Sequence, residues 1–269
     1  MQKDSKNLAL KIRIHALNMT KNGSSSHIGS ILSIADILAV LYSSVMRINP
    51  KKPYWEKRDK FILSKGHAGA GVYAALAEKG YFPVEELNKH YKNGSNFSGH
   101  VSHVNIPGVE FSTGSLGHGL GVGCGIAYAN KLDAKDQFTY VLLSDGECDE
   151  GSNWEAILFA SHHKLKKLIA IVDYNKIQSL KSTKETLDLE PFQDKWISFG
   201  WRVINVNGHS HEELLNAFHE AKKSSKPTCI IANTIKGKGV SFMENSVLWH
   251  YRSPQGEEYE KALKELEDA

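Results

Sequence analysis

Tyr140–Gly151 reads YVLLSDGECDEG and Leu168–Gln178 reads LIAIVDYNKIQ, with one segment of about helical length between them. Each stretch opens with an apolar run, so together they predict a strand–helix–strand unit. In an open parallel sheet, ligands bind at the carboxyl ends of the strands. Asp145 follows the first apolar run and Asn175 follows the second. Both side chains are therefore expected on the same rim of a parallel sheet.

The residues at this rim indicate a metal–diphosphate site. Carboxylate and amide oxygens are hard donors of the kind that Mg²⁺ takes while it bridges to phosphates. Gly146 has no Cβ, so a phosphate can approach its backbone N–H. A tight turn after a strand is the competing interpretation, because Asp-Gly is a common turn dipeptide. The pairing of Asp145 with Asn175 favours the metal site. Glu150 either belongs to the site or complements the dipole of the following helix.

Strands and helices alternate through the second half of the chain, which predicts an α/β fold. We expect a doubly wound, mostly parallel sheet with helices on both faces. No linker or repeat interrupts the sequence, so residues 1–269 are expected to form a single domain. Strands are expected at 58–64, 138–144, 167–174, 201–206 and 227–235. Helices are expected at 5–18, 33–45, 70–79, 120–131, 153–163, 189–200, 210–224 and from 257 onward.

The composition is that of a globular protein, with 41% hydrophobic and 23% charged residues. The net charge of +3 is spread along the chain, so neither nucleic acid nor a membrane is expected as a partner. Met1–Asn7 is polar, and no apolar run is expected to reach the roughly 18 residues of a membrane span. A cytoplasmic location is therefore predicted. Three scattered cysteines suggest no disulfide framework; two are expected in the core, and Cys148 is expected to be a passive loop residue.

Eleven of the 13 histidines fall into two groups, and the remaining two are His103 and His209. Five stand where the chain breaks, most of them next to glycine, and imidazoles converging there could bind phosphate or move protons. These are His27, His67, His100, His118 and His250. Six are expected on solvated surfaces, and these are His15, His90, His162, His163, His211 and His219. A site role for His209 is not favoured. Zinc is not favoured either, because no Cys/His spacing of a zinc site occurs. Lys236 is expected to be solvated or part of a lid, because its turn is not a phosphate-binding loop.

The combination of these motifs resembles the transketolase family over about residues 5–255. The resemblance rests on Asp145-Gly146 with Asn175 some thirty positions on, and on a set of flanking motifs. The flanking motifs are His27-Ile-Gly29, Ser64-Lys-Gly-His-Ala68, Ser98-Gly-His100, Ser112-Thr-Gly-Ser-Leu-Gly117 and Lys236-Gly-Lys-Gly239 with His250 downstream. The resemblance implies a thiamine diphosphate-binding fold and transfer of a two-carbon ketol unit from a ketose to an aldose.

The resemblance also implies a role for each matching residue. Mg²⁺ or Ca²⁺ would be held by Asp145, Asn175 and the carbonyl of Ile177. The diphosphate of thiamine diphosphate would contact Gly146, His67 and His250, and the aminopyrimidine ring would contact the backbones of Gly114 and Leu116. The substrate channel would be lined by His27, His67, His100 and His250. Glu150 matches an acidic position at the cofactor site and subunit interface.

The sequence departs from the family in four places and in one large feature. Ser144 stands where the family has glycine, Ile28 where it usually has proline, and His118 where many members have glutamine. The loop after His100 differs in length, so either His100 or His103 corresponds to the channel histidine. The domain that binds the pyrimidine ring has no counterpart in the sequence. The resemblance therefore implies the N-terminal subunit of a split transketolase, paired with a C-terminal subunit that carries the pyrimidine-binding domain, as an α₂β₂ assembly. The substrate would be a sugar phosphate or a specialised or nucleotide sugar.

Three alternatives stay open at this point. The chain could be a subunit of another thiamine diphosphate enzyme, either one like deoxyxylulose phosphate synthase or one like an oxo-acid dehydrogenase. It could also be a non-catalytic, cofactor-binding regulatory subunit. The histidine set favours transketolase over the first two, and the full set of metal and histidine positions argues against the third.

Overall fold

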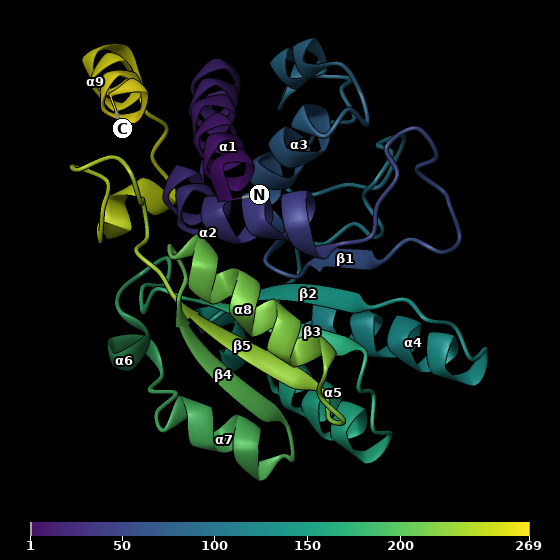
Figure 1. The fold of residues 1–269 in the computed structure, drawn as a ribbon. Coiled ribbons are helices and arrows are strands. Elements are labelled where there is room, and N and C mark those ends of the chain that lie inside the picture. Colours follow the sequence, from purple (N-terminus) through teal and green to yellow (C-terminus); the bar gives the residue numbers. More distant parts are fainter. Residues whose placement is uncertain (1, 269) are drawn as a thin grey trace.

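The computed structural model describes residues 2–268, which include one five-stranded sheet in the order β1-β2-β3-β5-β4 (Figure 1). Every neighbouring pair of strands is parallel, as predicted. The strands are β1 (Lys60–Leu63), β2 (Thr139–Ser144), β3 (Leu168–Tyr174), β4 (Arg202–Asn207) and β5 (Thr228–Asn233). Each expected strand boundary lies within two residues of the observed one, because the apolar runs are short and polar residues bound them.

Helices cover both faces of the sheet, which confirms the doubly wound α/β class. On one face lie α1 (Gln2–Gly23), α2 (Ile28–Val40), α3 (Gly69–Glu78) and α8 (His211–Lys222), with α9 (Gly256–Glu267) packed on α1. On the other lie α4 (Gly119–Leu132), α5 (Gly151–His162) and α7 (Phe192–Ser198). The short α6 (Thr183–Thr186) follows β3. Along β2, Tyr140 and Leu142 enter the first core while Val141 and Leu143 enter the second.

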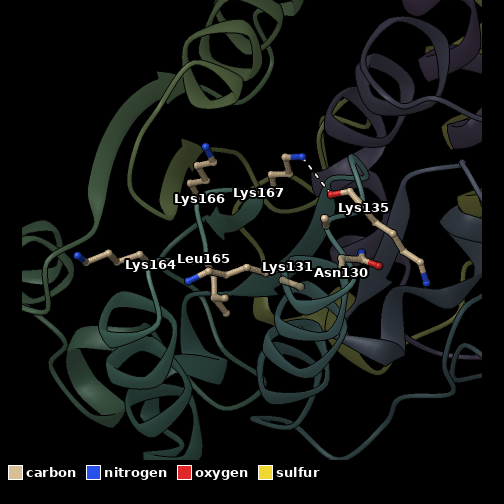
Figure 2. Close-up of a pocket in the computed structure, with 9 residues that line it drawn as sticks. Asn130, Lys131, Lys135, Lys164, Leu165, Lys166 and Lys167 are labelled. Carbon is tan, nitrogen blue, oxygen red and sulfur yellow. Dashed lines mark hydrogen bonds between the residues drawn. The ribbon is translucent and has the colours of Figure 1, made fainter.

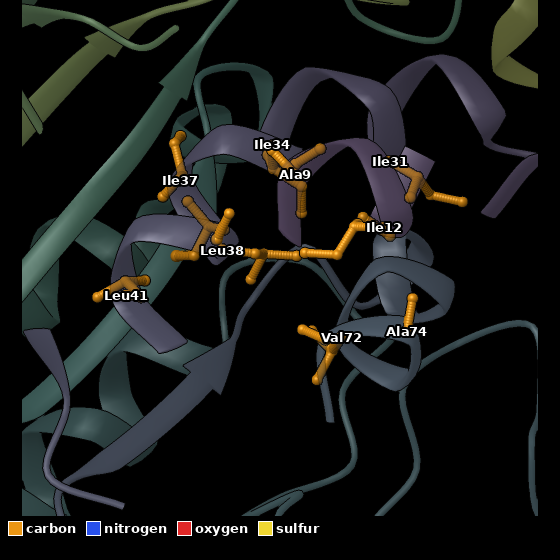
Figure 3. Packing of buried hydrophobic residues seen from close by; sticks show 14 of the residues in the cluster. Ala9, Ile12, Ile31, Ile34, Ile37, Leu38, Leu41, Val72 and Ala74 are labelled. Atoms are coloured by element: carbon orange, nitrogen blue, oxygen red, sulfur yellow. The ribbon is translucent and has the colours of Figure 1, made fainter. Parts of the chain in front are cut away.

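Helix α2 is the centre of the larger core, and all of its residues are buried. Figure 3 shows its isoleucines and leucines packed between α1 and α3. A π-helical turn, Leu41–Val45, extends α2. The stretch Ile28–Val45 has 18 residues and a mean hydropathy of 1.8, so the expectation that no apolar run reaches this length is wrong. Because 89% of that stretch is buried inside the fold, its apolar character is that of a core helix.

The N-terminal boundary of α2 differs from the prediction by five residues. The helix was expected to begin at Ser33, with Ile28 and Gly29 at the close of the preceding loop, because glycine is a typical loop residue. The structure places them in the first turn of α2, directly after His27 in a left-handed conformation with φ 77°. Small residues fit here because the turn lies against other chain segments: a Cβ on Gly29 would stand 3.2 Å from the carbonyl oxygen of Trp249. The start of α2 is thereby brought to the rim of the sheet.

Candidate active site

A pocket of about 220 Å³ lies at the carboxyl ends of β1, β2 and β3. Strand β2 delivers Asp145, strand β3 delivers Asn175, and the turn after β1 delivers His67. All the predicted site residues except Glu150 line this one pocket, and they are His27, His67, His100, Gly114, Leu116, Asp145, Gly146, Asn175, Ile177 and His250. Segments more than 200 residues apart in sequence therefore meet at the predicted rim.

Four histidines form a close group on one side of the pocket. The ring centroid of His27 lies 5.1 Å from that of His67, 5.7 Å from that of His100 and 5.0 Å from that of His250. The backbone N–H of His27 donates to the carbonyl oxygen of His250 at 2.8 Å. A left-handed non-glycine residue stores backbone strain, which often occurs at functional sites. With this backbone conformation, the ring of His27 lies against the rings of the other three histidines.

Three of these imidazoles are held in the neutral form near pH 7. Burial, followed by the positive charges of His100, Lys236 and Lys65, lowers the pKa of His27 to about 4. Burial and nearby cations lower the pKa of His250 to about 3 and that of His67 well below its ordinary value. A neutral imidazole offers one donor and one acceptor. The buried Nδ1 of His250 has no hydrogen-bond partner among the described residues, so it has capacity for a bound group.

The two side chains predicted to hold a metal, those of Asp145 and Asn175, both line the pocket. Asp145 is buried and accepts hydrogen bonds from the backbone N–H groups of Gly146, at 2.7 Å, and Lys176. Burial and the nearby charge of Asp173 raise the pKa of Asp145 to about 7. A cation would relieve this unfavourable charge. Asn175 donates its amide N–H to Asp173 at 3.0 Å, and its Oδ1 accepts from the N–H of Ile177.

The donor set fits a hard cation that is shared with a phosphate. Residues 2–268 contain no group of three or more His, Cys, Asp or Glu side chains able to hold a metal by themselves. A carboxylate, an amide and the carbonyl of Ile177 supply oxygens only, which suits Mg²⁺ or Ca²⁺ rather than zinc. The remaining ligands must then come from outside the protein, as they do when Mg²⁺ bridges to a substrate phosphate.

Two buried lysines belong to the site and were missed or misread in the sequence. Lys65 is 1% exposed, and its ammonium donates to the carboxylate of Asp173 at 2.5 Å. Lys236 is 2% exposed rather than solvated or part of a lid, so that prediction is wrong. Its ammonium contacts the Ser30 hydroxyl at 3.2 Å and the Ile177 carbonyl at 3.4 Å. Lys65 could have been found from its place directly after the buried strand β1. The position of Lys236 depends on contacts that only the fold creates.

The charge balance at these lysines suits an anion. Burial, then the charge of Lys65, lowers the pKa of Lys236 to about 8. The ammonium of Lys236 bonds to a neutral hydroxyl and a carbonyl, so its buried charge lacks a carboxylate at contact distance. A buried charge is costly unless it is paired. A diphosphate in the pocket would supply the missing negative charge.

The wall beside Gly146 leaves little spare room. A Cβ on Gly146 would stand 2.5 Å from Cγ of Gln178, so no other residue fits without displacement. The amide of Gln178 is fixed by a hydrogen bond of 2.7 Å to Asp149. The N–H of Gly146 donates to Asp145 and the Cβ position is filled by Gln178, so the approach of a phosphate to Gly146 stays a prediction.

Glu147, in the turn after β2, was not among the predicted site residues. It holds neighbouring turns of the site in place. It is fully buried and accepts hydrogen bonds from the Ser64 hydroxyl and the N–H of Gly117. These bonds join the turns after β1 and β2 to the start of α4. By contrast, Glu150 is exposed at the N-terminus of α5 and does not line the pocket, so the structure does not place it with the cofactor-binding residues.

His103, the alternative to His100, and the chain-break residue His118 both lie outside the pocket. His103 is exposed, stacks on Phe111 with a centroid distance of 6.4 Å, and bonds to Ser112. His100 is therefore the histidine of this loop that faces the pocket. His118 is exposed where α4 begins.

The histidines that were expected on the surface divide into correct and wrong predictions. His162 and His219 are exposed, as predicted, while His15 and His163 are half-buried. His90 and His211 are buried, so their assignment to the surface is wrong. Both bond to hydroxyls from distant segments: His90 to Ser25 at 3.1 Å, and His211 to Ser5 at 2.7 Å. Helical periodicity alone does not reveal such tertiary partners.

The three cysteines are buried and free. Cys148 was expected in a passive loop position, and burial raises the pKa of its thiol well above the ordinary value. It is therefore unsuited to nucleophilic chemistry.

A second cavity, of about 200 Å³, lies near the amino ends of β2 and β3 (Figure 2). Five lysines line it, and these are Lys131, Lys135, Lys164, Lys166 and Lys167. Several already have partners: Lys131 donates to the carbonyl of His163 at the end of α5, and Lys167 donates to Asp136 at 2.6 Å. Because α4 and α5 both end here, their dipoles place negative charge at this cavity. Each dipole amounts to about half an elementary charge and offsets only part of the charge of the five lysines.

Comparisons with known proteins agree with this geometry. Residues 4–266 match the family described as the transketolase thiamine diphosphate-binding domain. The chain is 40% identical to one of the apulose-4-phosphate transketolase subunits of Phocaeicola vulgatus, over 96% of this chain and 92% of that protein. It is 43% identical to the 6-deoxy-6-sulfo-D-fructose transketolase subunit SqwG of a Clostridium species, over 90% of this chain and 88% of that protein. The crystal structure of Campylobacter jejuni transketolase superposes with a TM-score of 0.91 at 34% identity, over 98% of this chain but 43% of that one.

Proposed function

Because the chain belongs to the transketolase family, whose thiamine diphosphate-binding domain it matches over residues 4–266, we propose that it is the N-terminal subunit of a two-subunit transketolase. The enzyme is a transferase that moves a two-carbon ketol unit from a ketose to an aldose. Support comes from the relatives: the chain aligns with nearly the whole of two proteins named as transketolase subunits, but with 43% of the Campylobacter enzyme. These matches favour transketolase over the deoxyxylulose phosphate synthase-like and oxo-acid dehydrogenase-like alternatives.

The partner is a C-terminal transketolase subunit that carries the pyrimidine-binding domain, and the assembly is α₂β₂. The pocket supports a site shared between two chains, because its buried charged residues lie in one small region where β1, β2 and β3 end. That region suits the diphosphate and metal end of the cofactor. The other end of the cofactor would be held by the partner. Like the assembly, the cytoplasmic location remains a prediction.

The observation that carries the proposal is the convergence of oxygen ligands and buried cations in one pocket. Asp145, Asn175 and the carbonyl of Ile177 hold Mg²⁺ or Ca²⁺. Lys236 supplies positive charge to the diphosphate, and the backbone of Gly146 lies against it. His67 and His250 donate hydrogen bonds to the diphosphate oxygens, a role supported by the partnerless Nδ1 of His250. The backbones of Gly114 and Leu116 face the aminopyrimidine ring.

Thiamine diphosphate, when bound, supplies carbanion stabilisation at its thiazolium ring, which the protein side chains lack. The histidines of this chain move the protons of the sugar. The lowered pKa of His27 keeps its ring neutral at pH 7, so the ring can accept a proton from a substrate hydroxyl and return it. His100, exposed at the mouth of the pocket, binds the next hydroxyl along the sugar chain.

The substrate class follows the relatives. Their names contain a phosphorylated sugar and a sulfonated one, which are both anionic. We therefore place the donor among ketoses with an anionic group, such as sugar phosphates, and keep specialised and nucleotide sugars as the second class. The exposed ring of His100 is the first group of this chain that an incoming sugar would meet.

Reconstitution with the partner tests the proposal. This chain is co-expressed with a pyrimidine-domain protein sought in the neighbouring reading frames, and ketose–aldose exchange is measured with thiamine diphosphate and Mg²⁺. We expect each of the two proteins to be inactive by itself and the complex to be active. Full activity of this chain alone would disprove the two-subunit claim. Cofactor binding without any exchange by the complex would favour the non-catalytic alternative.

A further inference from the structure

A buried carboxylate on α2, Asp36, is the centre of a charged network outside the pocket. Asp36 is 6% exposed. Arg13 of α1 donates to both of its oxygens, at 3.2 and 2.5 Å. His209, between β4 and α8, contacts it at 2.7 Å, and His211, the first residue of α8, contacts it at 3.0 Å. Burial opposes the charge of Asp36, but the hydrogen bonds from the two histidines and the charge of Arg13 hold its pKa below the ordinary value.

One arm of this network reaches the turn that carries Lys236. Nε2 of His209 accepts the backbone N–H of Ile235 at 2.8 Å. Arg13 donates from Nε to the carbonyl of Lys238 at 3.2 Å, on the far side of the same turn. The turn is thus attached through His209 just before Lys236 and through Arg13 just after it. Both attachments depend on the single carboxylate of Asp36.

We propose that His209 is a positioning residue for the cofactor site: oriented by Asp36, it fixes the 235–239 turn so that the ammonium of Lys236 points into the pocket. The inference rests on the proposed function and extends it to a residue that does not line the pocket. His209 acts through the backbone of Ile235, and Lys236 is the group that meets the diphosphate.

The hydrogen-bond pattern defines the state of His209 that this role requires. Because Nε2 accepts a backbone N–H, it carries no proton, so the ring proton lies on Nδ1 and is donated to Asp36. A carboxylate that fixes the tautomer of a histidine, and through it the orientation of a functional group, is a common supporting arrangement in protein sites. Asp36 fixes the tautomer of His209 by accepting its Nδ1–H, and Nε2 of His209 then holds the turn by accepting the N–H of Ile235.

The chain contains a matched control for this role. His211 also bonds to Asp36 and is more deeply buried than His209, with a side chain 5% rather than 13% exposed. Its second nitrogen bonds to the Ser5 hydroxyl in α1 and not to the 235–239 turn. Loss of either histidine removes one hydrogen bond to Asp36, but only loss of His209 releases Ile235.

Hydrogen–deuterium exchange of the full chain tests the positioning without any ligand. In His209→Ala, we expect amides 235–239 to exchange about fivefold faster, since one hydrogen bond is lost. In His211→Ala, the same amides should stay within about twofold of wild type, although both variants should lose thermal stability. His209→Gln keeps an acceptor near Ile235 and should restore most of the protection. Unchanged exchange in His209→Ala, or equal acceleration in His211→Ala, would overturn the inference.

A double-mutant cycle tests the consequence for binding. Affinity for thiamine diphosphate with Mg²⁺ is measured by calorimetry on the complex with the partner. His209→Ala should weaken it about tenfold, and His211→Ala should leave it within about twofold. In a Lys236→Met background, His209→Ala should add little, because the two residues act in series. Full additivity would contradict the proposed route. A wild-type complex that does not bind the cofactor would refute the proposed function, while the exchange comparison would still decide the role of His209.

Discussion

The two lysine-bearing cavities lie at opposite ends of β2 and β3, and they differ in the burial and pairing of their lysines. At the carboxyl ends, Lys65 and Lys236 are buried and converge on a pocket with a single close carboxylate partner, Asp173. At the amino ends, five lysines surround a cavity of similar size, with Lys164 and Lys166 exposed to solvent (Figure 2).

Helix direction explains much of the difference. In a parallel α/β sheet, helices begin near the carboxyl ends of the strands and end near the amino ends. Helix α2 therefore begins beside the pocket, where its dipole adds positive charge. Helices α4 and α5 end beside the lysine cavity, where their dipoles offset part of the lysine charge. A count of lysines would favour the wrong cavity. Burial and unpaired charge favour the pocket.

The largest expected effect comes from removing His27, and it tests whether the pocket carries out the chemistry. His27→Ala should lower the exchange rate of the reconstituted enzyme about 1,000-fold, the usual scale for a lost general acid–base group. The exposed His103 is the control, and His103→Ala should stay within about twofold. The measurement is kcat for ketose–aldose exchange at saturating cofactor. Equal losses in the two variants would remove the distinction between pocket and surface.

The next effect compares one lysine from each cavity. Lys236→Met removes a buried charge that would pair with the diphosphate, so affinity for thiamine diphosphate should fall about 100-fold. Lys166→Met removes an exposed lysine and should change the affinity less than about twofold. Calorimetric titration of both variants in the presence of Mg²⁺ decides this. Similar affinities for the two variants would show that burial does not distinguish the cavities.

The sequence pattern was enough to predict that Asp145 and Asn175 lie at one rim of the sheet. It was not enough to predict which lysines are buried there. Asp145 and Asn175 were found because polar residues directly follow apolar strands, and parallel strands bring their carboxyl ends to one rim. The four histidines were found from chain breaks and from the family resemblance. In contrast, Lys236 was misread as solvated, because nothing in its local sequence shows that Ser30 and Ile177 enclose it.

The network around Asp36 was invisible for the same physical reason. Arg13, Asp36 and His211 come from α1, α2 and the start of α8, and helical periodicity predicts each element without its neighbours. The start of α2 was misplaced because Gly29 is a loop residue by propensity. Tertiary packing against Trp249 outweighed that propensity.

A smaller effect concerns stability and pH, and it distinguishes the buried pocket histidines from exposed ones. The pKa of His250 is lowered to about 3 in the folded state, while the unfolded chain titrates near 6.5. Between these values the unfolded state binds more protons, so His250 makes the fold less stable as the pH falls below 6.5. The raised pKa of Asp145 has the opposite sign, so the test compares variants rather than pH values alone.

His250→Asn removes this titration. Between about pH 7 and pH 5, its free energy of unfolding should fall by about 2 kcal/mol less than that of the wild type. Urea unfolding at the two pH values measures the difference. The matched change at the exposed His219, His219→Asn, should follow the wild type at both pH values. A wild-type-like pH response of His250→Asn would mean that its ring is not held neutral by the fold.

The most direct test of the account is a titration of thiamine diphosphate with Mg²⁺ into the complex of this chain with its partner. We predict one cofactor per copy of this chain, loss of measurable binding in Asp145→Asn, and wild-type affinity when Lys164 and Lys166 are both replaced by methionine. Wild-type affinity in Asp145→Asn, or loss of binding on replacement of the two exposed lysines, would contradict the assignment of the cofactor to the pocket at the carboxyl ends of β2 and β3.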